Sequence, residues 1–307
     1  MKLSFILAAY KYKYLSEAIK SILHQTYRDF ELVVVDDCSP EGLQEIVADF
    51  QDERICYVRN EKNLGGTNLV AAWNKALEQA RGEWCVLASD DDIYLPDYAS
   101  RMLALCEKYP QCNVFHCRTA VIDDEGMVSK IAEKRPEHES CADLLYARGV
   151  KRCLQTAPEF MFKREALQRI GGFVNFPLAW YSDDATWLAL AREHGVVCSS
   201  EVLFHWRYSG INISSRFDIT AKKVQAAEEY KTWLRKFIPT VKPLSHEDGM
   251  VLKYAAEHIF EAVDQQTLYD LDDTRFWLWL RILIKEQLSP RLRLRTIRNR
   301  MRKVLHI

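Results

Sequence analysis

The sequence predicts an α/β fold with a mainly parallel sheet flanked by helices, followed by an all-helical C-terminal extension. Over the first 120 residues, short apolar runs alternate with segments whose apolar residues recur at helical spacing, which is typical of βαβ units. These runs are apolar throughout, as expected for strands covered on both faces. From Asp218 onward every pattern is helical. The alternation stops near 212–218, so we expect an α/β domain over 1–215 and a helical extension over 216–307.

The first part of the chain is predicted to contain strands at 3–8, 31–36, 54–58 and 83–89 and helices at 15–23, 42–50 and 70–80. The opening segment MKLSFILAA is predicted to be a strand, because its apolar core of seven residues is short for a signal peptide. In the first helix, Leu15, Ile19 and Ile22 share one face. The second strand, ELVVVD, is rich in β-branched residues. Gly82 ends the third helix.

The middle of the chain has a mixed pattern. Strands are predicted at 113–122, 159–162 and 196–204, and helices at 141–148, 164–170 and 184–193. The extension is predicted to form helices at 219–237, 246–264, 270–287 and 290–305.

The composition narrows the class of protein. Apolar residues make up 48% of the 307 residues and charged residues 28%, which excludes a disordered or collagen-like chain. The nine cysteines include no CxxC pair and are odd in number, so we expect reduced thiols in a cytoplasmic protein. The longest apolar stretch, Phe276 to Ile284, is nine residues and contains an arginine, whereas a bilayer span needs about 20.

The net charge of −1 hides an asymmetry along the chain. From Arg275 to the end there are eight arginines, two lysines and one glutamate, a net charge of +9, which leaves −10 on residues 1–274. This tail also contains the aromatic run 276–280. It is expected either to pack on the α/β domain with its arginines in solvent, or to lie on an anionic membrane surface. The acidic body argues against nucleic-acid binding.

Acidic residues stand at the ends of two predicted strands, where open α/β sheets bind ligands. Asp36 and Asp37 end the second strand, and Asp90, Asp91 and Asp92 end the fourth. An aspartate pair at such a place is also a common turn former or helix N-cap. Three consecutive carboxylates repel one another, and a hard divalent cation would relieve the repulsion. A solvated acidic loop is the alternative.

A third acidic pair, Asp183 and Asp184, begins the helix predicted at 184–193. Ser182 or Asp183 is expected to cap this helix, which leaves Asp184 at the helix start, facing a cleft. The chain has no GxGxxG motif after a strand, no Walker loop, no HExxH and no GxSxG. The acidic clusters are therefore the candidate functional residues.

Three segments together resemble the family 2 glycosyltransferases, inverting enzymes of the GT-A fold that use nucleotide sugars. The segments are SFILAAYKYKYLSEAIKSILHQTYRDFELVVVDDCSPEG, NEKNLGGTNLVAAWNKALEQARGEWCVLASDDDIYLPDY and GGFVNFPLAWYSDDATWLALAREHG. The resemblance covers about residues 2–215 and implies a GT-A domain there. The helical tail resembles no family.

The resemblance implies roles for the residues at the strand ends. Tyr10 would lie against the nucleobase, Asp37 would accept a hydrogen bond from the base, and Asp90 would contact the ribose. Asp91 would bind Mn²⁺ or Mg²⁺ against the diphosphate, and Asp92 would be a further or water-mediated ligand.

Asp184 matches the general base of the family, which would deprotonate the attacking hydroxyl of the acceptor. The chain departs from the family after the first strand, where Ala8-Ala9-Tyr10-Lys11 replaces the usual Pro-Thr-Tyr-Asn. The acceptor is expected to contact the loops 123–140 and 173–182. No motif encodes the donor sugar, the acceptor or the linkage.

We therefore expect a metal-dependent inverting glycosyltransferase of the hexosyltransferase type. It would move a sugar from a nucleotide donor, UDP-linked by preference, to a glycan or lipid-linked glycan. The resemblance implies bacterial surface polysaccharide synthesis. If the basic tail lies on a membrane, the protein is expected at the inner face of the cell membrane. One alternative is a sugar-nucleotide-binding protein of the same fold without catalysis. The other is a sugar nucleotidyltransferase, which would need a glycine-rich loop where this chain has YKYKYLSEA.

Overall fold

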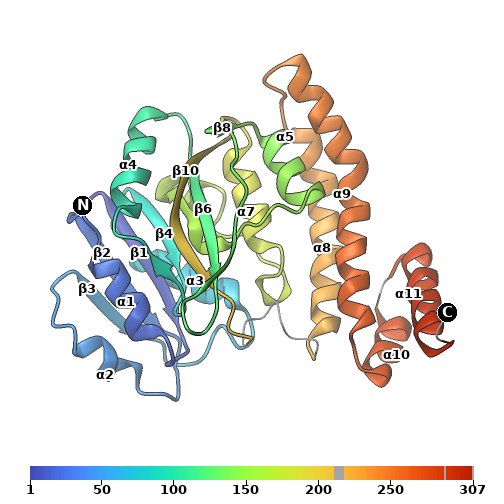
Figure 1. Ribbon diagram of the computed structural model, residues 1–307, viewed down its shortest axis with the longest axis horizontal. Helices are drawn as coiled ribbons and strands as arrows, with labels where there is room; N and C mark the ends of the chain where they lie inside the picture. Colours follow the sequence, from blue (N-terminus) through green and yellow to red (C-terminus); the bar gives the residue numbers. More distant parts are fainter. Residues whose placement is uncertain (211–217, 287, 306–307) are drawn as a thin grey trace.

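A computed structural model describes residues 1–210, 218–286 and 288–305. It contains one ten-stranded sheet with helices on both faces (Figure 1). The strand order along the sheet is β3-β2-β1-β4-β9-β6-β10-β5, with β7 paired to β6 and β8 paired to β10.

One half of the sheet is parallel and consists of β1 (Leu3–Ala9), β2 (Phe30–Asp36), β3 (Ile55–Arg59) and β4 (Trp84–Ala88). The helices that connect these strands are α1 (Leu15–Leu23), α2 (Leu43–Ala48) and α3 (Leu69–Gln79). The βαβ alternation predicted from the sequence is thus confirmed. The expectation that all four strands are covered on both faces was wrong for β3, which lies at the edge of the sheet and is partly exposed.

The other half of the sheet consists of β5 (Ile93–Tyr94), β6 (Val114–Ile122), β7 (Val128–Ile131), β8 (His138–Glu139), β9 (Phe160–Lys163) and β10 (Val196–Arg207). Strand β9 runs antiparallel to both β4 and β6, whereas β10 runs parallel to β6. The sheet is therefore parallel from β3 to β4 and mixed beyond.

The helical elements of this half are α4 (Tyr98–Lys108), α5 (Cys141–Leu144), η1 (Leu145–Val150), η2 (Ala157–Glu159), α6 (Arg164–Arg169), η3 (Pro177–Ala179) and α7 (Ser182–Ala191). Helix α4 was not predicted. The helix predicted at 141–148 forms, but it changes to a π-helical turn, η1, at Leu145.

The core consists of two apolar layers, one on each face of the sheet. Along β1, Leu3, Phe5 and Leu7 pack in the layer beneath α1 and α4, while Ile6 points to the opposite layer beneath α3 and α7. This alternation follows from the period of two along a strand. The nine cysteines are all free, and six of them are buried, as expected of reduced thiols.

The C-terminal extension divides into two parts, and it consists of α8 (Thr220–Phe237), η5 (Ile238–Thr240), α9 (His246–Asp272), α10 (Phe276–Lys285) and α11 (Pro290–Leu305). Tyr230 and Leu234 of α8 and Ile259 of α9 belong to the same apolar layer as α7. The first two helices therefore share the core of the α/β part. The boundary expected at 215/216 lies outside the described residues.

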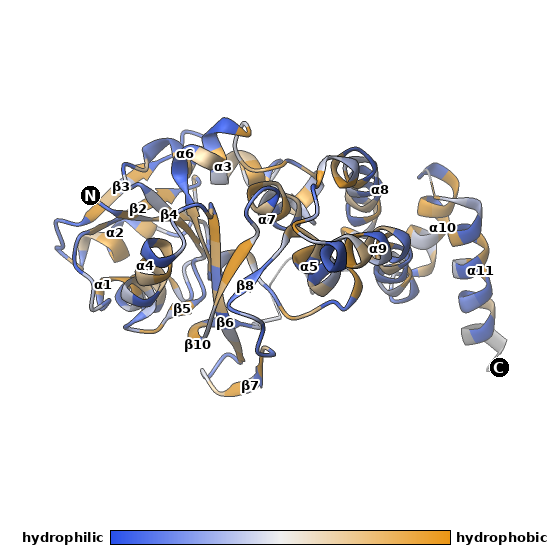
Figure 2. Cartoon of the chain, turned by 90° about the horizontal axis from the view of Figure 1, so that it is seen from above, coloured by the Kyte–Doolittle hydropathy of each residue, from blue (hydrophilic) through white to orange (hydrophobic). Residues whose placement is uncertain are grey.

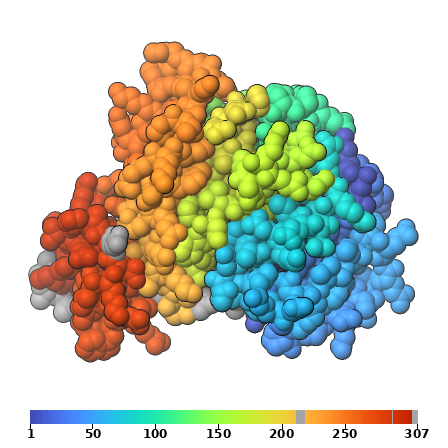
Figure 3. All heavy atoms as spheres, turned by 180° about the vertical axis from the view of Figure 1, so that it is seen from behind, coloured from blue at the N-terminus to red at the C-terminus, as the bar shows by residue number. Residues whose placement is uncertain are grey.

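Helices α10 and α11 form a smaller cluster of their own. Trp279 packs with Leu271 at the end of α9, and its indole N–H donates to Thr296 Oγ1 at 2.9 Å. The pair lies at one end of the molecule, away from the N-terminal strands (Figures 2 and 3). No helix in the described ranges combines the length and hydrophobicity that crossing a bilayer requires.

Candidate functional site

The carboxyl ends of β1, β2 and β4 meet at one edge of the sheet, because these strands are parallel neighbours. Here they form a cavity of about 480 Å³, which we call the strand-end cavity. A cavity of this size is typical of small-ligand sites. The structure brings together at this cavity the predicted residues of the first two acidic clusters and the aromatic after β1, namely Tyr10, Asp37, Asp90, Asp91 and Asp92.

Asp90 joins the ends of β1 and β4. The backbone N–H groups of Tyr10 and Lys11 donate to Asp90 Oδ2 at 2.9 and 2.7 Å. Lys11 Nζ lies 3.0 Å from Asp90 Oδ1 and also contacts Asp91 Oδ2. Burial raises the pKa of Asp90, and Lys11 opposes that shift. Burial lowers the pKa of Lys11, but the charges of Asp90 and Asp91 outweigh it and leave the pKa above its ordinary value.

Asp92 and Arg207 hold the acidic segment, residues Asp90 to Asp92, in place. Asp92 Oδ1 accepts a hydrogen bond from the backbone N–H of Arg207 at 2.8 Å. The buried Arg207 side chain donates to the carbonyl oxygens of Asp91, Asp123 and Asp124 at 3.0 to 3.1 Å and pairs with Glu17. Burial raises the pKa of Asp92 well above its usual range. Sequence reasoning assigned no role to Arg207.

The two aspartates after β2 have different environments. Asp36 is fully buried, accepts hydrogen bonds from the Tyr57 hydroxyl at 2.6 Å and the Ser39 N–H at 2.8 Å, and pairs with Arg59. These bonds occupy its carboxylate within the protein, so Asp36 is a structural residue.

Asp37 faces the strand-end cavity and anchors the loop 60–66. Its carboxylate accepts hydrogen bonds from Asn60 Nδ2 at 2.7 Å, from the Leu64 N–H at 2.9 Å and from the Gly65 N–H at 2.6 Å. A carboxylate has about four acceptor positions, so one remains for a ligand. A Cβ at Gly65 would lie 3.0 Å from Asp37 Oδ2, which explains the glycine at this close approach.

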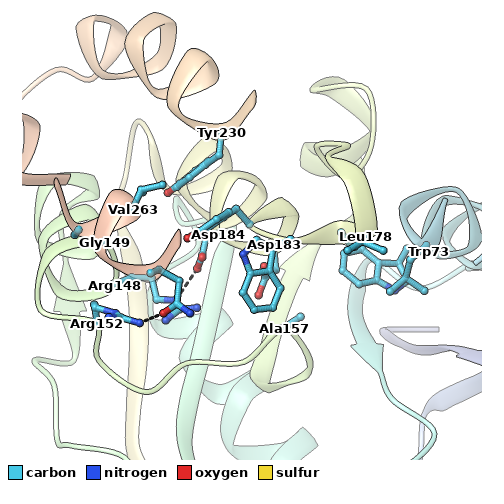
Figure 4. A pocket seen from close by; sticks show the side chains of 16 residues that line it. Trp73, Arg148, Gly149, Arg152, Ala157, Leu178, Asp183, Asp184, Tyr230 and Val263 are labelled. Carbon is cyan, nitrogen blue, oxygen red and sulfur yellow. Dashed lines mark hydrogen bonds and ion pairs between the residues drawn. The ribbon is translucent and has the colours of Figure 1, made fainter. Parts of the chain in front are cut away.

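A second cavity, of about 450 Å³, adjoins the first, and Leu69, Trp73 and Ala157 line both. We call it the helix-side cavity, because its walls come from η1, α7, α8 and α9 (Figure 4). Asp183 and Asp184 lie in its lining. The third acidic pair therefore lies beside the strand-end cavity but outside it.

Asp184 is paired with an arginine that sequence reasoning missed. Arg148 Nε donates to Asp184 Oδ1 at 2.7 Å, as the dashed line in Figure 4 marks. Asp184 is 5% exposed and the Arg148 side chain 31%. Burial, together with the negative charge of Asp184, raises the pKa of the neighbouring Asp183 to about 7.

The start of α7 differs from the prediction. The N-cap residue is Tyr181, with a φ of 66°, and no side chain caps the helix. The expectation that Ser182 or Asp183 is the cap was wrong, because Ser182 is already helical and its Oγ accepts a hydrogen bond from the Phe176 N–H instead.

Backbone strain is concentrated in the helix-side cavity. In the described part of the chain, six non-glycine residues have positive φ, and four of them line this cavity: Arg152, Leu178, Ala179 and Tyr181. Such conformations persist only where the surrounding structure imposes them, and they gather at ligand sites. The segment 173–182, predicted to contact the acceptor, contributes residues to this cavity, whereas no residue of 123–140, predicted with it, is in the lining of either cavity.

A divalent cation fits the strand-end cavity only with ligands from outside the protein. Within the described residues, no group of three or more His, Cys, Asp or Glu side chains is placed to hold a metal. Mg²⁺ is often held by one or two carboxylates together with substrate phosphates. Asp91 suits this mode, since it is a hard oxygen donor in the cavity lining and its Oδ2 already faces a cation, the Lys11 ammonium.

Comparisons with known proteins show the family and the fold of the chain. The family model described as glycosyl transferase family 2 matches residues 4–171. The putative teichuronic acid biosynthesis glycosyltransferase TuaG of Bacillus subtilis is 28% identical over 214 residues, 68% of this chain and 80% of that protein. Three curated relatives described as uncharacterized glycosyltransferases are matched over 55%, 57% and 66% of their lengths, so the chain spans between about half and two thirds of these proteins.

Two solved structures share the fold. S. aureus TarS 1–349 in complex with UDP-GlcNAc superposes with a TM-score of 0.60 at 18% identity, over 98% of this chain and 89% of that one. The mannosyltransferase PcManGT of Pyrobaculum calidifontis, in complex with GDP-Man and Mn²⁺, superposes with a TM-score of 0.57 at 19% identity, over 97% and 84%.

Proposed function

The chain belongs to glycosyl transferase family 2, and from this premise we propose that it transfers a sugar from a nucleotide donor, UDP-linked by preference, to a glycan acceptor with inversion. The observation that carries the proposal is the pair of adjoining cavities. One is lined by the strand-end carboxylates and the other by Asp183 and Asp184, and Trp73 lies in the lining of both. The relatives with described settings, such as TuaG, favour surface polysaccharide synthesis.

The donor nucleotide binds in the strand-end cavity. Tyr10 is exposed there, and its ring can lie against the base, while the remaining acceptor position of Asp37 can take the N–H of uracil. Asp90 contacts the ribose. The two superposed relatives bind UDP-GlcNAc and GDP-Man respectively, so the base preference rests on Asp37.

Asp91 would hold the divalent cation, Mn²⁺ or Mg²⁺. Asp92, which accepts a hydrogen bond from the backbone N–H of Arg207, would be a further or water-mediated ligand. A bound cation acts as a Lewis acid that offsets the charge of a departing nucleoside diphosphate. Ser89 donates to Asp91 Oδ1 at 2.6 Å and so orients the carboxylate. The leaving group then needs no proton from the protein.

The acceptor binds in the helix-side cavity, and Asp184 takes the proton from its attacking hydroxyl. A positioned base of this kind contributes about 10²–10⁴-fold in rate. Arg148 orients the Asp184 carboxylate through the hydrogen bond from its Nε to Asp184 Oδ1. Since Tyr230 of α8 and Val263 of α9 line the cavity, the first two helices of the extension form part of the acceptor site (Figure 4).

A screen of UDP-sugars and GDP-sugars tests the proposal, with thermal stability measured in the presence and absence of Mn²⁺, because a ligand of the folded state raises its apparent stability. The expected result is stabilisation by one UDP-sugar with Mn²⁺. Hydrolysis of that donor without acceptor then separates an enzyme from a binding protein. A protein that binds the donor and never cleaves it, with or without glycan acceptors, would support the non-catalytic alternative.

We also propose that α10 and α11 lie on an anionic membrane surface at the inner face of the cell membrane. The exposed residues of α11 include both apolar and basic ones, namely Leu294, Ile297, Arg298, Met301 and Arg302. On α10, Trp277, Arg281, Ile284 and Lys285 are exposed at helical spacing. Neither helix contains an acidic residue. Glu286 lies between them, directly after α10. Apolar insertion beside basic residues is the chemistry of interfacial helices.

Point variants test the membrane proposal better than truncation, since removing α11 would also remove Thr296 from the Trp279 cluster. Leu294→Ser/Ile297→Ser/Met301→Ser and Arg281→Gln/Arg298→Gln/Arg302→Gln should each reduce sedimentation with vesicles that contain anionic lipid. A matched control, Lys20→Gln/Arg101→Gln/Lys108→Gln on α1 and α4, removes the same charge far from α10 and α11 (Figure 1). If the control variant loses binding as strongly, the attraction is a net-charge effect and the docking face is refuted.

A further inference from the structure

The Lys11 ammonium lies against two carboxylates of the strand-end cavity, at the place proposed above for a divalent cation. This ammonium lies between Asp90 Oδ1, at 3.0 Å, and Asp91 Oδ2. Within the described residues, no other side chain forms an ion pair with either aspartate. Both aspartates are buried, so this one cation carries the charge compensation of the pair.

The two aspartates do not depend on Lys11 equally. Asp90 also accepts two backbone N–H bonds, from Tyr10 and from Lys11 itself, which any residue except proline at position 11 would keep. Among the residues that the structure describes, the other oxygen of Asp91 has the Ser89 hydroxyl as its one side-chain donor. The Lys11 ammonium is therefore the main partner of Asp91 Oδ2, the oxygen that a metal would need.

The Lys11 side chain is able to leave this position. It is 33% exposed, lines the strand-end cavity, and ends a flexible four-carbon stem. A nucleoside diphosphate in the cavity would offer the ammonium a second set of anionic oxygens. A cation that moves from Asp91 to the diphosphate frees Asp91 Oδ2 at the moment the phosphates arrive.

We propose that Lys11 is a tethered cation that competes with the divalent metal for Asp91. When a nucleoside diphosphate binds, the Lys11 ammonium moves to the phosphates and leaves Asp91 to the metal. The inference rests on the proposed function, because it assumes that Asp91 holds the metal. Lys11 thereby couples the two ligands: metal binds weakly without nucleotide and tightly with it. Each ligand must raise the affinity of the other by the same factor.

The test measures Mn²⁺ binding to the full-length protein by the electron paramagnetic resonance signal of free Mn²⁺, without nucleotide and with saturating UDP. Lys11→Gln should bind Mn²⁺ without UDP about 5- to 150-fold more tightly than the wild type, the usual range of coupling between sites. In this variant UDP should raise the Mn²⁺ affinity less than it does in the wild type. Lys11→Arg keeps the cation and should behave as the wild type does.

Lys13→Gln is the matched control, since Lys13 is exposed and pairs with Asp124 at 3.0 Å, outside the carboxylate pair. Lys11→Met serves in place of Lys11→Gln if that variant does not fold. Equal Mn²⁺ affinities of the wild type and the Lys11 variants, with UDP raising both alike, would refute the role of Lys11 and leave the metal proposal standing. If neither binds Mn²⁺ even with UDP, the metal proposal fails and the Lys11 inference fails with it.

Discussion

Replacing Arg148 by methionine removes the guanidinium from Asp184 and keeps most of the apolar side chain. Asp184 is 5% exposed, so the variant leaves a nearly buried carboxylate without its 2.7 Å partner. Breaking a fully buried pair in this way costs about 3–5 kcal/mol. Because Arg148 is 31% exposed and solvent already screens the pair, we expect a smaller loss, about 2–4 kcal/mol in the free energy of unfolding.

Urea denaturation of four proteins measures this loss: the wild type, Arg148→Met, Asp184→Asn and the double variant. The double variant should recover part of the loss, since asparagine carries no buried charge, and the cycle should give a coupling of about 0.5–3 kcal/mol. Arg192→Met is the control, because Arg192 forms an exposed pair with Glu193 that contributes about 1 kcal/mol or less. UDP binding should be unchanged in Arg148→Met, since Arg148 does not line the strand-end cavity. A loss below about 0.5 kcal/mol, no larger than the scatter of ordinary surface substitutions, would refute the claim that Arg148 compensates Asp184.

Three further predictions concern the acidic residues. Asp91→Asn should stay folded and lose the gain in UDP affinity that Mn²⁺ provides, which calorimetry with and without EDTA measures. Full transfer activity of the wild type in EDTA would contradict the assignment of Asp91 to a metal. Asp37→Ala should weaken UDP binding by about 1.5–3 kcal/mol, the range for a hydrogen bond to a charged group, and equal affinity of the wild type for UDP and GDP would argue against base selection by Asp37. The raised pKa of Asp183, about 7 against an ordinary 3.9, means that the folded state binds this proton more tightly than the unfolded chain, so stability should fall as the pH rises from about 4 to 7. Asp183→Asn should flatten that fall in urea midpoints between pH 4.5 and pH 8, and an unchanged slope would show that other groups cause it.

Strands β1, β2 and β4 of the parallel half were predictable because they are buried on both faces and are therefore largely apolar. The strand-end site followed from the same fact, since parallel neighbours place Asp37 and Asp90 at one edge. The strand predicted at 54–58 forms as β3, but the expectation that both its faces are covered was wrong, because β3 is an edge strand. Sequence reasoning also missed α4, although Tyr98, Met102 and Cys106 share its buried face at helical spacing and could have been found.

The partners of the acidic residues could not have been predicted. Arg148 is 36 residues from Asp184, and Lys11 is 80 from Asp91, so no spacing rule connects them. The resemblance identified position 11 only as a departure from the family, and the structure supplies the reason that the lysine matters. The helix-side cavity also depends on how α8 and α9 dock, which is a tertiary property that hydrophobic periodicity does not encode.

The hydrogen bonds of Arg207 bear on the order in which the protein can fold during synthesis. Its backbone N–H binds Asp92 and its side chain binds Asp91 and Glu17, which precede it by 115, 116 and 190 residues. The acidic segment therefore leaves the ribosome long before the strand that fixes it. Until β10 inserts between β6 and β5, the carboxylates of this segment lack their support from the last strand, and the growing sheet keeps an open edge. Contacts of such long range form slowly, so the nascent chain should be most prone to aggregation, and most dependent on chaperones, during the synthesis of residues 95–207.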